Sequence, residues 1–305
     1  MRILITGGAG FIGANLTRLL LDHGYELTVL DDFSADSEAN LLGLPLRLIQ
    51  ANILDESAVQ SAVNGHQAIV HLAAQTGVPG SLLDPRRDCE INVIGTLNVL
   101  EAARNANPNI KFIFASSNAP LGRQLPPAAE DKAPLPISPY GASKLAGEAY
   151  CLAYHGSWRL QTIALRFANV YGPFSSHKTS VVAKFFKDLA AGRRITIHGD
   201  GQQTRDFLYV EDLCRAVLQS LQSELSGEVF QVATGVETSI LEIATMIQQL
   251  VGSGAEIFHD AALTGDIRIN YSSISKIKNI LNWEPLVDLP HGLKQTWEHM
   301  RDHLN

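Results

Sequence analysis

Short aliphatic runs alternate with amphipathic stretches through the first half of the chain. The amphipathic stretches have helical periodicity and lie at residues 11–23, 56–63 and 92–105. The aliphatic runs have the length and continuous hydrophobicity of strands buried on both faces, and they lie at residues 2–6, 26–31, 46–50, 68–72, 111–115 and 161–166. Because right-handed crossovers place the connecting helices on alternate faces, this order predicts an α/β fold with a doubly wound parallel sheet.

This rhythm changes after about residue 170. A polar segment is followed by a helical pattern near residues 181–191 and by a Gly-Asp-Gly turn at residues 199–201. Residues 208–232 again have the pattern of sheet and helix. We therefore expect a Rossmann domain over residues 1–169, to which residues 208–232 return, and a smaller C-terminal substrate-binding lobe over residues 170–305.

Composition narrows the class of protein. The 305 residues are 46% hydrophobic and 18% charged, which is enough apolar material for one large core or a core with a smaller lobe. No apolar run approaches the roughly 18 residues that would span a bilayer, and the apolar run at residues 3–5 of the first strand follows directly after Met1 and Arg2. A net charge of −7 argues against a nucleic-acid partner. These features predict a cytoplasmic protein that neither crosses a membrane nor binds nucleic acid.

Cysteine and histidine residues give no metal-binding pattern. Cys89, Cys151 and Cys214 are far apart, and reduced, buried thiols are expected. The ten histidines are scattered, without a spacing that would place two ligands on one helix face. We expect no metal.

A glycine-rich turn follows the first strand and precedes the first helix. Glycines let backbone N–H groups approach a pyrophosphate at the positive end of that helix. The turn reads GGAGFIG, with the wider G-x-x-G-x-x-G spacing at Gly7, Gly10 and Gly13. Although such turns also occur for packing reasons alone, the strand before it and the helix after it indicate a dinucleotide site.

The carboxylate of Asp31, at the end of the second strand, indicates which dinucleotide the protein binds, NAD or NADP. Asp31 can accept hydrogen bonds from both hydroxyls of an adenosine ribose and would repel a 2′-phosphate, so NAD is predicted rather than NADP. Asp32 lies beside it, and both could instead cap a turn. Asn52 and Ile53, after the third strand, are placed to meet the adenine, although Asn52 could be an ordinary loop residue.

Tyr140 and Lys144 lie four residues apart, where a helix is expected to begin after the proline-rich loop at residues 125–139. A phenol with a pKa near 10 is a poor base at neutral pH, so chemistry needs an adjacent ammonium to stabilise the phenolate. Lys144 can provide it. A lone Tyr-x-x-x-Lys is a weak pattern, but here it follows a dinucleotide fingerprint.

The chain resembles the extended short-chain dehydrogenase/reductases, and within them the NAD-dependent nucleotide-sugar epimerase and dehydratase family. Beyond the glycine turn and the Tyr140/Lys144 pair, the resemblance rests on HLAAQ at 71–75, N-x-x-G-T at 92–96, RFANVYGP at 166–173, GDG at 199–201, TRDF at 204–207, LNWEP at 281–285 and GL at 292–293. It implies that the cofactor site also includes Phe11, Ile12, Leu72, Ala73, Ala74, Gln75 and Asn92, together with Tyr140 and Lys144.

The resemblance also implies a third catalytic residue and a reaction. Ser117 takes the place of the family's Ser or Thr that hydrogen-bonds the sugar hydroxyl. The family's 4,6-dehydratases carry Asp and Glu at the next two positions, where this chain has Asn118 and Ala119. Neither can exchange protons at neutral pH, and the Glu of the family's decarboxylases is also absent. An NAD-dependent 4-epimerase acting on a UDP-sugar through a transient 4-keto intermediate is therefore predicted.

For the substrate side, the resemblance implies contacts with the nucleotide diphosphate and the base. The residues expected there are Asn169, Val181, Phe185 and Arg205, and Arg205 could alternatively pair with Asp206 or Asp212. The family's second diphosphate arginine is missing at residues 263–266, and Arg268 could replace it. Further candidates for reading the sugar are Ser81, Asn118, Arg86, Arg87, His177 and Lys178.

Alternatives remain open. A nucleotide-sugar dehydrogenase or reductase would consume NAD stoichiometrically, and a dehydratase would release water. A non-catalytic NAD-binding regulator would not need Ser117, Tyr140 and Lys144 together. Family members commonly dimerise through the helix with Tyr140 and the helix at 92–105, so a homodimer is expected, with Leu145, Ala149 and Leu152 as a possible apolar stripe.

Overall fold

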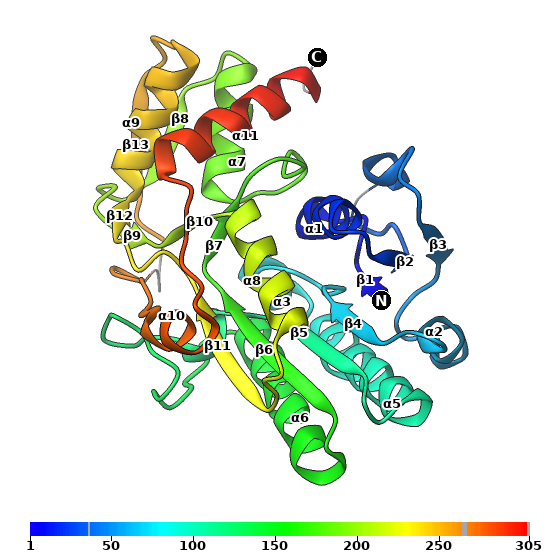
Figure 1. The fold of residues 1–305 in the computed structure, drawn as a ribbon. Helices are drawn as coiled ribbons and strands as arrows, with labels where there is room; N and C mark the ends of the chain where they lie inside the picture. Colours follow the sequence, from blue (N-terminus) through cyan, green and yellow to red (C-terminus); the bar gives the residue numbers. More distant parts are fainter. Residues whose placement is uncertain (36, 264–266, 304–305) are drawn as a thin grey trace.

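The central element of the fold is a parallel sheet. The computed structural model describes residues 1–35, 37–263 and 267–303 (Figure 1). Seven strands pair in the order β11-β6-β5-β4-β1-β2-β3, and every pairing is parallel. The strands are β1 (Arg2–Thr6), β2 (Glu26–Asp31), β3 (Arg47–Gln50), β4 (Ala68–His71), β5 (Lys111–Ser117), β6 (Gln161–Phe167) and β11 (Glu228–Val232). The predicted doubly wound parallel sheet is confirmed.

Helices cover both faces of this sheet (Figure 1). Because successive strand side chains point to opposite faces, Ile3 and Ile5 enter one core while Leu4 enters the other. The first core is closed by α1 (Phe11–Asp22) and α8 (Val210–Gln222). The second core is closed by α2 (Glu56–Val63), α5 (Thr96–Ala106) and α6 (Pro139–Trp158).

A third core lies in the C-terminal part, among side chains such as Phe186, Ile243 and Met300. Its helices are α7 (Val181–Ala190), α9 (Ile240–Val251) and α11 (Leu289–His303), and α10 (Ser275–Leu281) packs against β11. Three strand pairs complete this part: β7 (Asn169–Tyr171) with β10 (Phe207–Tyr209), β9 (Thr204–Arg205) with β12 (Thr238–Ser239), and β8 (Ile195–His198) with β13 (Ile257–Asp260).

The chain returns to the main sheet late in the sequence. Strand β11, yellow in Figure 1, pairs with β6 in a register that places Gln231 opposite Arg166. Between β6 and β11 the chain builds α7 and β8 of the C-terminal part. The two parts are therefore interleaved along the sequence.

The predicted elements agree with the observed ones to within two residues at most ends. The main difference is at residues 92–105, where the predicted helix is a π-helical segment, η2 (Glu90–Gly95), followed by α5. Two short helices were not predicted, α3 (Val78–Leu83) and α4 (Pro85–Cys89). Each has a proline in its first turn and is too short for an apolar periodicity to show. Short 3-10 turns are present at η1 (Glu38–Leu41) and η3 (Ala119–Leu121).

One prediction about the cysteines was wrong. Cys151 and Cys214 are buried, but Cys89 is exposed because it ends the short surface helix α4. Within the described ranges, no helix combines the length and the apolar composition that crossing a bilayer requires.

Candidate active site

The glycine turn between β1 and α1 allows backbone segments to approach closely. Gly7 has a φ of +72°, and a Cβ on it would lie 2.6 Å from the Ala73 nitrogen. A Cβ on Gly13 would lie 2.4 Å from the Gly7 oxygen and 2.5 Å from Gly8 Cα. Helix α1 begins after Gly10 without a side-chain cap. The first turn of α1 can thus present its N–H groups to an anion.

Carboxylates at the end of β2 are held beside this turn. The two oxygens of Asp31 accept hydrogen bonds from Ala9 N and Phe33 N, both at 2.9 Å. Asp32 Oδ2 accepts a 2.6 Å hydrogen bond from the Asn52 amide. The acidic end of β2 is thereby fixed to the glycine turn on one side and to the segment after β3 on the other.

These groups line a cavity of about 520 Å³ at the carboxyl ends of the parallel strands, where ligands bind in such folds. Every predicted cofactor residue except Asn92 contributes to its wall. The predicted residues in the wall are Gly7, Gly10, Phe11, Ile12, Gly13, Asp31, Asp32, Asn52, Ile53, Leu72, Ala73, Ala74, Gln75, Tyr140 and Lys144. The wall does not include Ser81, Ser117, Asn118, Asn169, Val181, Phe185, Arg205 or Arg268.

Asn92 lies behind the wall. It is 1% exposed, and its amide oxygen accepts a 2.8 Å hydrogen bond from Gln75 N while its amide nitrogen donates to Gln75 O at 2.9 Å. The same nitrogen lies within hydrogen-bond distance of Asp88 Oδ2 and Ser143 Oγ. Asn92 thus holds the Gln75 main chain in the cavity wall.

We expect Gly13→Ala to prevent NAD binding, because the added Cβ would overlap backbone atoms of the turn that carries Gly7 and Gly8. Calorimetric titration of the purified variant with NAD measures this loss. Gly156→Ala is the matched control, since a Cβ at Gly156 in α6 meets nothing within 4 Å. Alanine there should stabilise the helix by about 0.5–1 kcal/mol. Unchanged NAD binding by Gly13→Ala would contradict the geometry assigned to this turn.

The Tyr140/Lys144 pair begins helix α6. The Ser138 hydroxyl caps the helix by accepting a 3.1 Å hydrogen bond from Gly141 N, and Pro139 occupies the first turn. Burial raises the pKa of Tyr140 to about 12, while the neighbouring Ser117 hydroxyl acts in the opposite direction. The structure therefore brings Ser117 and Tyr140 together.

Lys144 lies one helical turn further, with its side chain 3% exposed. Its Nζ donates a 2.9 Å hydrogen bond to Ala115 O and lies 5.1 Å from the centre of the Phe114 ring. Burial lowers the pKa of Lys144 to about 8, against the opposing charges of Asp88 and Glu148. The ammonium is consequently near its titration range at neutral pH.

His71 lies at the end of β4 as a neutral side chain. Burial lowers its pKa to about 3, with a smaller contribution from the charge of Lys144. Its Nδ1 is 2.7 Å from Thr6 Oγ1 and its Nε2 is 3.0 Å from Thr96 Oγ1. Because the Thr96 hydroxyl already donates to Asn92 O, the proton is assigned to Nε2. His71 therefore has a structural role: it connects Thr6 of β1 to Thr96 of α5.

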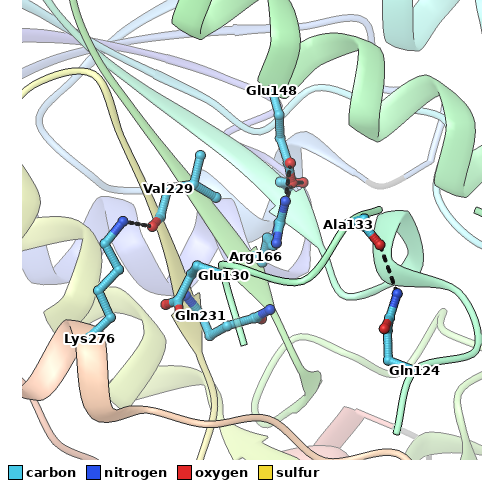
Figure 2. A network of polar contacts seen from close by, with 9 residues as sticks. Gln124, Glu130, Ala133, Glu148, Arg166, Val229, Gln231 and Lys276 are labelled. Atoms are coloured by element: carbon cyan, nitrogen blue, oxygen red, sulfur yellow. Dashed lines mark hydrogen bonds and ion pairs between the residues drawn. The ribbon is translucent and has the colours of Figure 1, made fainter. Parts of the chain in front are cut away.

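A buried ion pair connects α6, the helix of the Tyr140/Lys144 pair, to strand β6 of the sheet. Figure 2 shows Glu148 on α6 and Arg166 on β6 pointing at each other. The guanidinium donates to both carboxylate oxygens at 2.9 and 2.7 Å, and both side chains are at most 5% exposed. Ser116, next to Ser117, also donates to Glu148. One carboxylate thus joins α6 to the ends of β5 and β6.

The predicted substrate residues are dispersed. Ser81 is fully buried and donates to Val78 O, and Phe185 is 2% exposed in the third core. Asn118 donates to Ser272 Oγ at 3.0 Å, and Asn169 is exposed. The half-buried Val181 begins α7.

The two predicted diphosphate arginines both contact protein groups. Arg205 donates to Thr204 O and to Ile267 O, at 2.6 and 2.7 Å. Arg268 is 60% exposed and pairs with Asp200 at 2.7 Å. The family's second arginine would fall at Leu263, which is exposed, and the three residues that follow it, 264–266, lie outside the described residues.

Segment 173–178 joins the C-terminal part to the cavity. The Asn15 amide of α1 donates to Pro173 O, and Lys178 Nζ donates to Thr76 Oγ1, both at 3.0 Å. His177, Lys178 and Arg87, named among the sugar-reading candidates, line the cavity. Lining residues to which sequence reasoning gave no role include Thr76, Ile91, Ser116 and Phe167. Thr76 directly follows the motif at 71–75, and Phe167 is part of the one at 166–173.

The fold and this cavity define a class of protein: a dinucleotide-binding α/β protein whose cavity wall includes a tyrosine and a lysine, with Ser117 beside the tyrosine. The sequence profile described as "NAD dependent epimerase/dehydratase family" matches residues 3–233. The chain belongs to this family, and the predicted resemblance is confirmed.

Several relatives are similar to this chain over nearly all of its length. The UDP-glucose 4-epimerase of Mycolicibacterium smegmatis is 37% identical over 99% of both chains. The dTDP-glucose 4,6-dehydratase of Streptomyces niveus is 32% identical over 99% of this chain and 93% of its own. The solved structure of UDP-glucose 4-epimerase from Thermotoga maritima with UDP-glucose has a TM-score of 0.95 at 34% identity and covers 100% of both chains.

Proposed function

We propose that this protein is an NAD-dependent 4-epimerase of a UDP-sugar. The observation that carries the proposal is that Tyr140 and Lys144, one helical turn apart, line a dinucleotide cavity, with Ser117 close enough to influence the Tyr140 phenol. Relatives that are epimerases and relatives that are dehydratases are both more than 30% identical, so identity alone does not choose the reaction. Asn118 and Ala119 favour epimerisation, because neither side chain can exchange the protons that water loss requires.

The cavity wall fits NAD. The glycine turn lets main-chain N–H groups of α1 meet a pyrophosphate, and Asp31 lies where it can accept hydrogen bonds from ribose hydroxyls. When bound, NAD would accept a hydride from the sugar carbon and return it to the opposite face.

The chain's own residues supply binding and proton transfer. Ser117 hydrogen-bonds the sugar hydroxyl and the phenol, and Tyr140 removes the hydroxyl proton as general base. Tyr140 acts as the phenolate and becomes a neutral phenol when it takes the proton. The Lys144 ammonium stabilises this phenolate, before the transfer, against its unfavourable burial. During return of the hydride, Tyr140 gives the proton back, so the protein ends each turnover unchanged.

We assign the substrate contacts from the family resemblance. Arg205 and Arg268 would meet the diphosphate, and Asn169 and Val181 the nucleotide. Both arginines would exchange some of their present partners for phosphate oxygens. Ser81, Asn118 and Phe185 would shape the sugar and base pockets from behind, since each is held by protein contacts.

We further infer a cytoplasmic homodimer. Three unpaired cysteines suit a reducing compartment. On α6, Ala149 is exposed and Leu152 is 41% exposed, while Leu145 is half-buried, which leaves apolar surface for a partner helix.

The decisive experiment is incubation of the purified protein with UDP-glucose, UDP-glucuronate and UDP-N-acetylglucosamine in separate reactions without added NAD. The sugar protons are followed by NMR. We expect one of the sugars to convert to its 4-epimer without accumulation of NADH. Product that forms only with added NAD, together with stoichiometric NADH, would replace the epimerase proposal by a dehydrogenase. A 4-keto-6-deoxy product would identify a dehydratase.

A further inference from the structure

Asp88 is a buried carboxylate close to the Tyr140/Lys144 pair. It lies in α4, which packs against α6, and it is 1% exposed. Its Oδ2 accepts a 2.9 Å hydrogen bond from the Asn92 amide. Its Oδ1 is buried and has no hydrogen-bond partner within the described residues. A single neutral donor is poor compensation for burying a carboxylate, so another group must balance its charge.

The charges around Lys144 identify that group. On α6 itself the groups that act on the ammonium are Glu148 and Cys151, and the Glu148 charge is already paired with Arg166. From β4 it faces His71, which is neutral. From α4 it faces Asp88, whose charge raises the pKa of Lys144 more than that of Glu148 does. Asp88 and Lys144 form no ion pair within 4 Å in the described part of the chain, so the Asp88 charge acts on the ammonium across the α4–α6 contact.

Asp88 is also connected to the cofactor side of the cavity. The Asn92 nitrogen that contacts Asp88 also reaches Gln75 O and Ser143 Oγ. Ser143 directly precedes Lys144, and Gln75 lines the cavity. The carboxylate thus anchors the amide that links the cavity wall to the helix of the Tyr140/Lys144 pair.

We propose that Asp88 is a positioning residue: its buried negative charge keeps the Lys144 ammonium charged, and through Asn92 it fixes the Gln75 main chain in the cavity wall. The proposal rests on the proposed function, in which Lys144 stabilises the Tyr140 phenolate. It adds a group that touches neither substrate nor cofactor.

The test is the pH profile of kcat/KM for Asp88→Asn. Asparagine keeps the shape and can still accept the hydrogen bond from Asn92, so the variant removes mainly the charge. Because a negative charge raises the pKa of both Lys144 and Tyr140, its removal should move both limbs of the profile to lower pH by about one unit. An unmoved profile, even with reduced kcat, would overturn the proposal.

Two further variants separate charge from scaffolding. Glu56→Gln, which removes an exposed carboxylate on α2, should leave the profile in place. Asn92→Ala should weaken NAD binding without moving the profile, and a shift equal to that of Asp88→Asn would overturn the assignment to charge. Asp88→Ser repeats the measurement with a smaller neutral side chain if the asparagine variant does not fold.

A readout independent of turnover distinguishes this proposal from the proposed function. Tyrosinate absorbance near 295 nm, taken as the difference from a Tyr140→Phe background, reports ionisation of Tyr140 in the purified protein. At a fixed alkaline pH, Asp88→Asn should contain more phenolate than the wild type, and an equal fraction would overturn the proposal. Wild-type protein without epimerase activity would contradict the proposed function alone, because this titration would still decide the role of Asp88.

Discussion

Replacing Tyr140 by phenylalanine should reduce turnover of the UDP-sugar by about 10²–10⁴-fold, the usual contribution of a positioned general base. The ring remains in the cavity wall, so NAD binding should change little. Only the hydroxyl, which lies beside Ser117, is lost. Epimer formation by NMR and calorimetric titration with NAD measure the two effects separately.

Tyr150→Phe is the matched control for this substitution. Tyr150 lies on the same helix, is 37% exposed and is not among the residues that line the cavity. It should retain full activity. Near-normal turnover by Tyr140→Phe would exclude Tyr140 as the base and with it the proposed mechanism.

Replacing Glu148 by glutamine should destabilise the protein by about 3–5 kcal/mol, because it leaves the buried Arg166 charge without a counterion. Arg166 Nη1 already has no hydrogen-bond partner within the described residues, so the guanidinium has little else to turn to. Guanidinium chloride unfolding followed by circular dichroism gives the change in the free energy of unfolding.

Glu298→Gln provides the comparison for Glu148→Gln. Glu298 pairs with Lys294 at 4.0 Å on the surface of α11, and both side chains are more than half exposed. Screened pairs of this kind contribute at most about 1 kcal/mol. Equal losses of stability for the two variants would contradict the importance given to the buried pair.

Much of the fold could be predicted from the sequence because the strands of a sheet covered on both faces are continuously hydrophobic. Leu4 and Ile69 in one core, and Ile3 and Val70 in the other, give that signal without tertiary information. Helices α3 and α4 gave none, because they are short and are formed by local turns rather than by an apolar face. The π-helical η2 depends on tertiary contacts that no periodicity reveals.

The cofactor wall was predictable for a related reason. Residues that end parallel strands meet at one edge of the sheet, so motifs after β1, β2, β3 and β4 must converge. Whether a residue faces the cavity or lies behind it depends on side-chain direction, which the sequence does not give. Asn92 consequently proved to be a support of the wall, and Phe185 a core residue. The buried neighbours of Lys144, such as Asp88, follow only from packing between helices.

The late return of β11 has a consequence for synthesis of the chain on the ribosome. Strand β6 leaves the exit tunnel long before β11, since all of α7, β8 and α8 are made between them. Until then the outer edge of β6 has unpaired backbone groups, beside Ile163 and Leu165, which are fully buried in the finished molecule. Such an edge is a template for pairing with other chains. The nascent protein must therefore keep this edge from other chains until residue 232 is available.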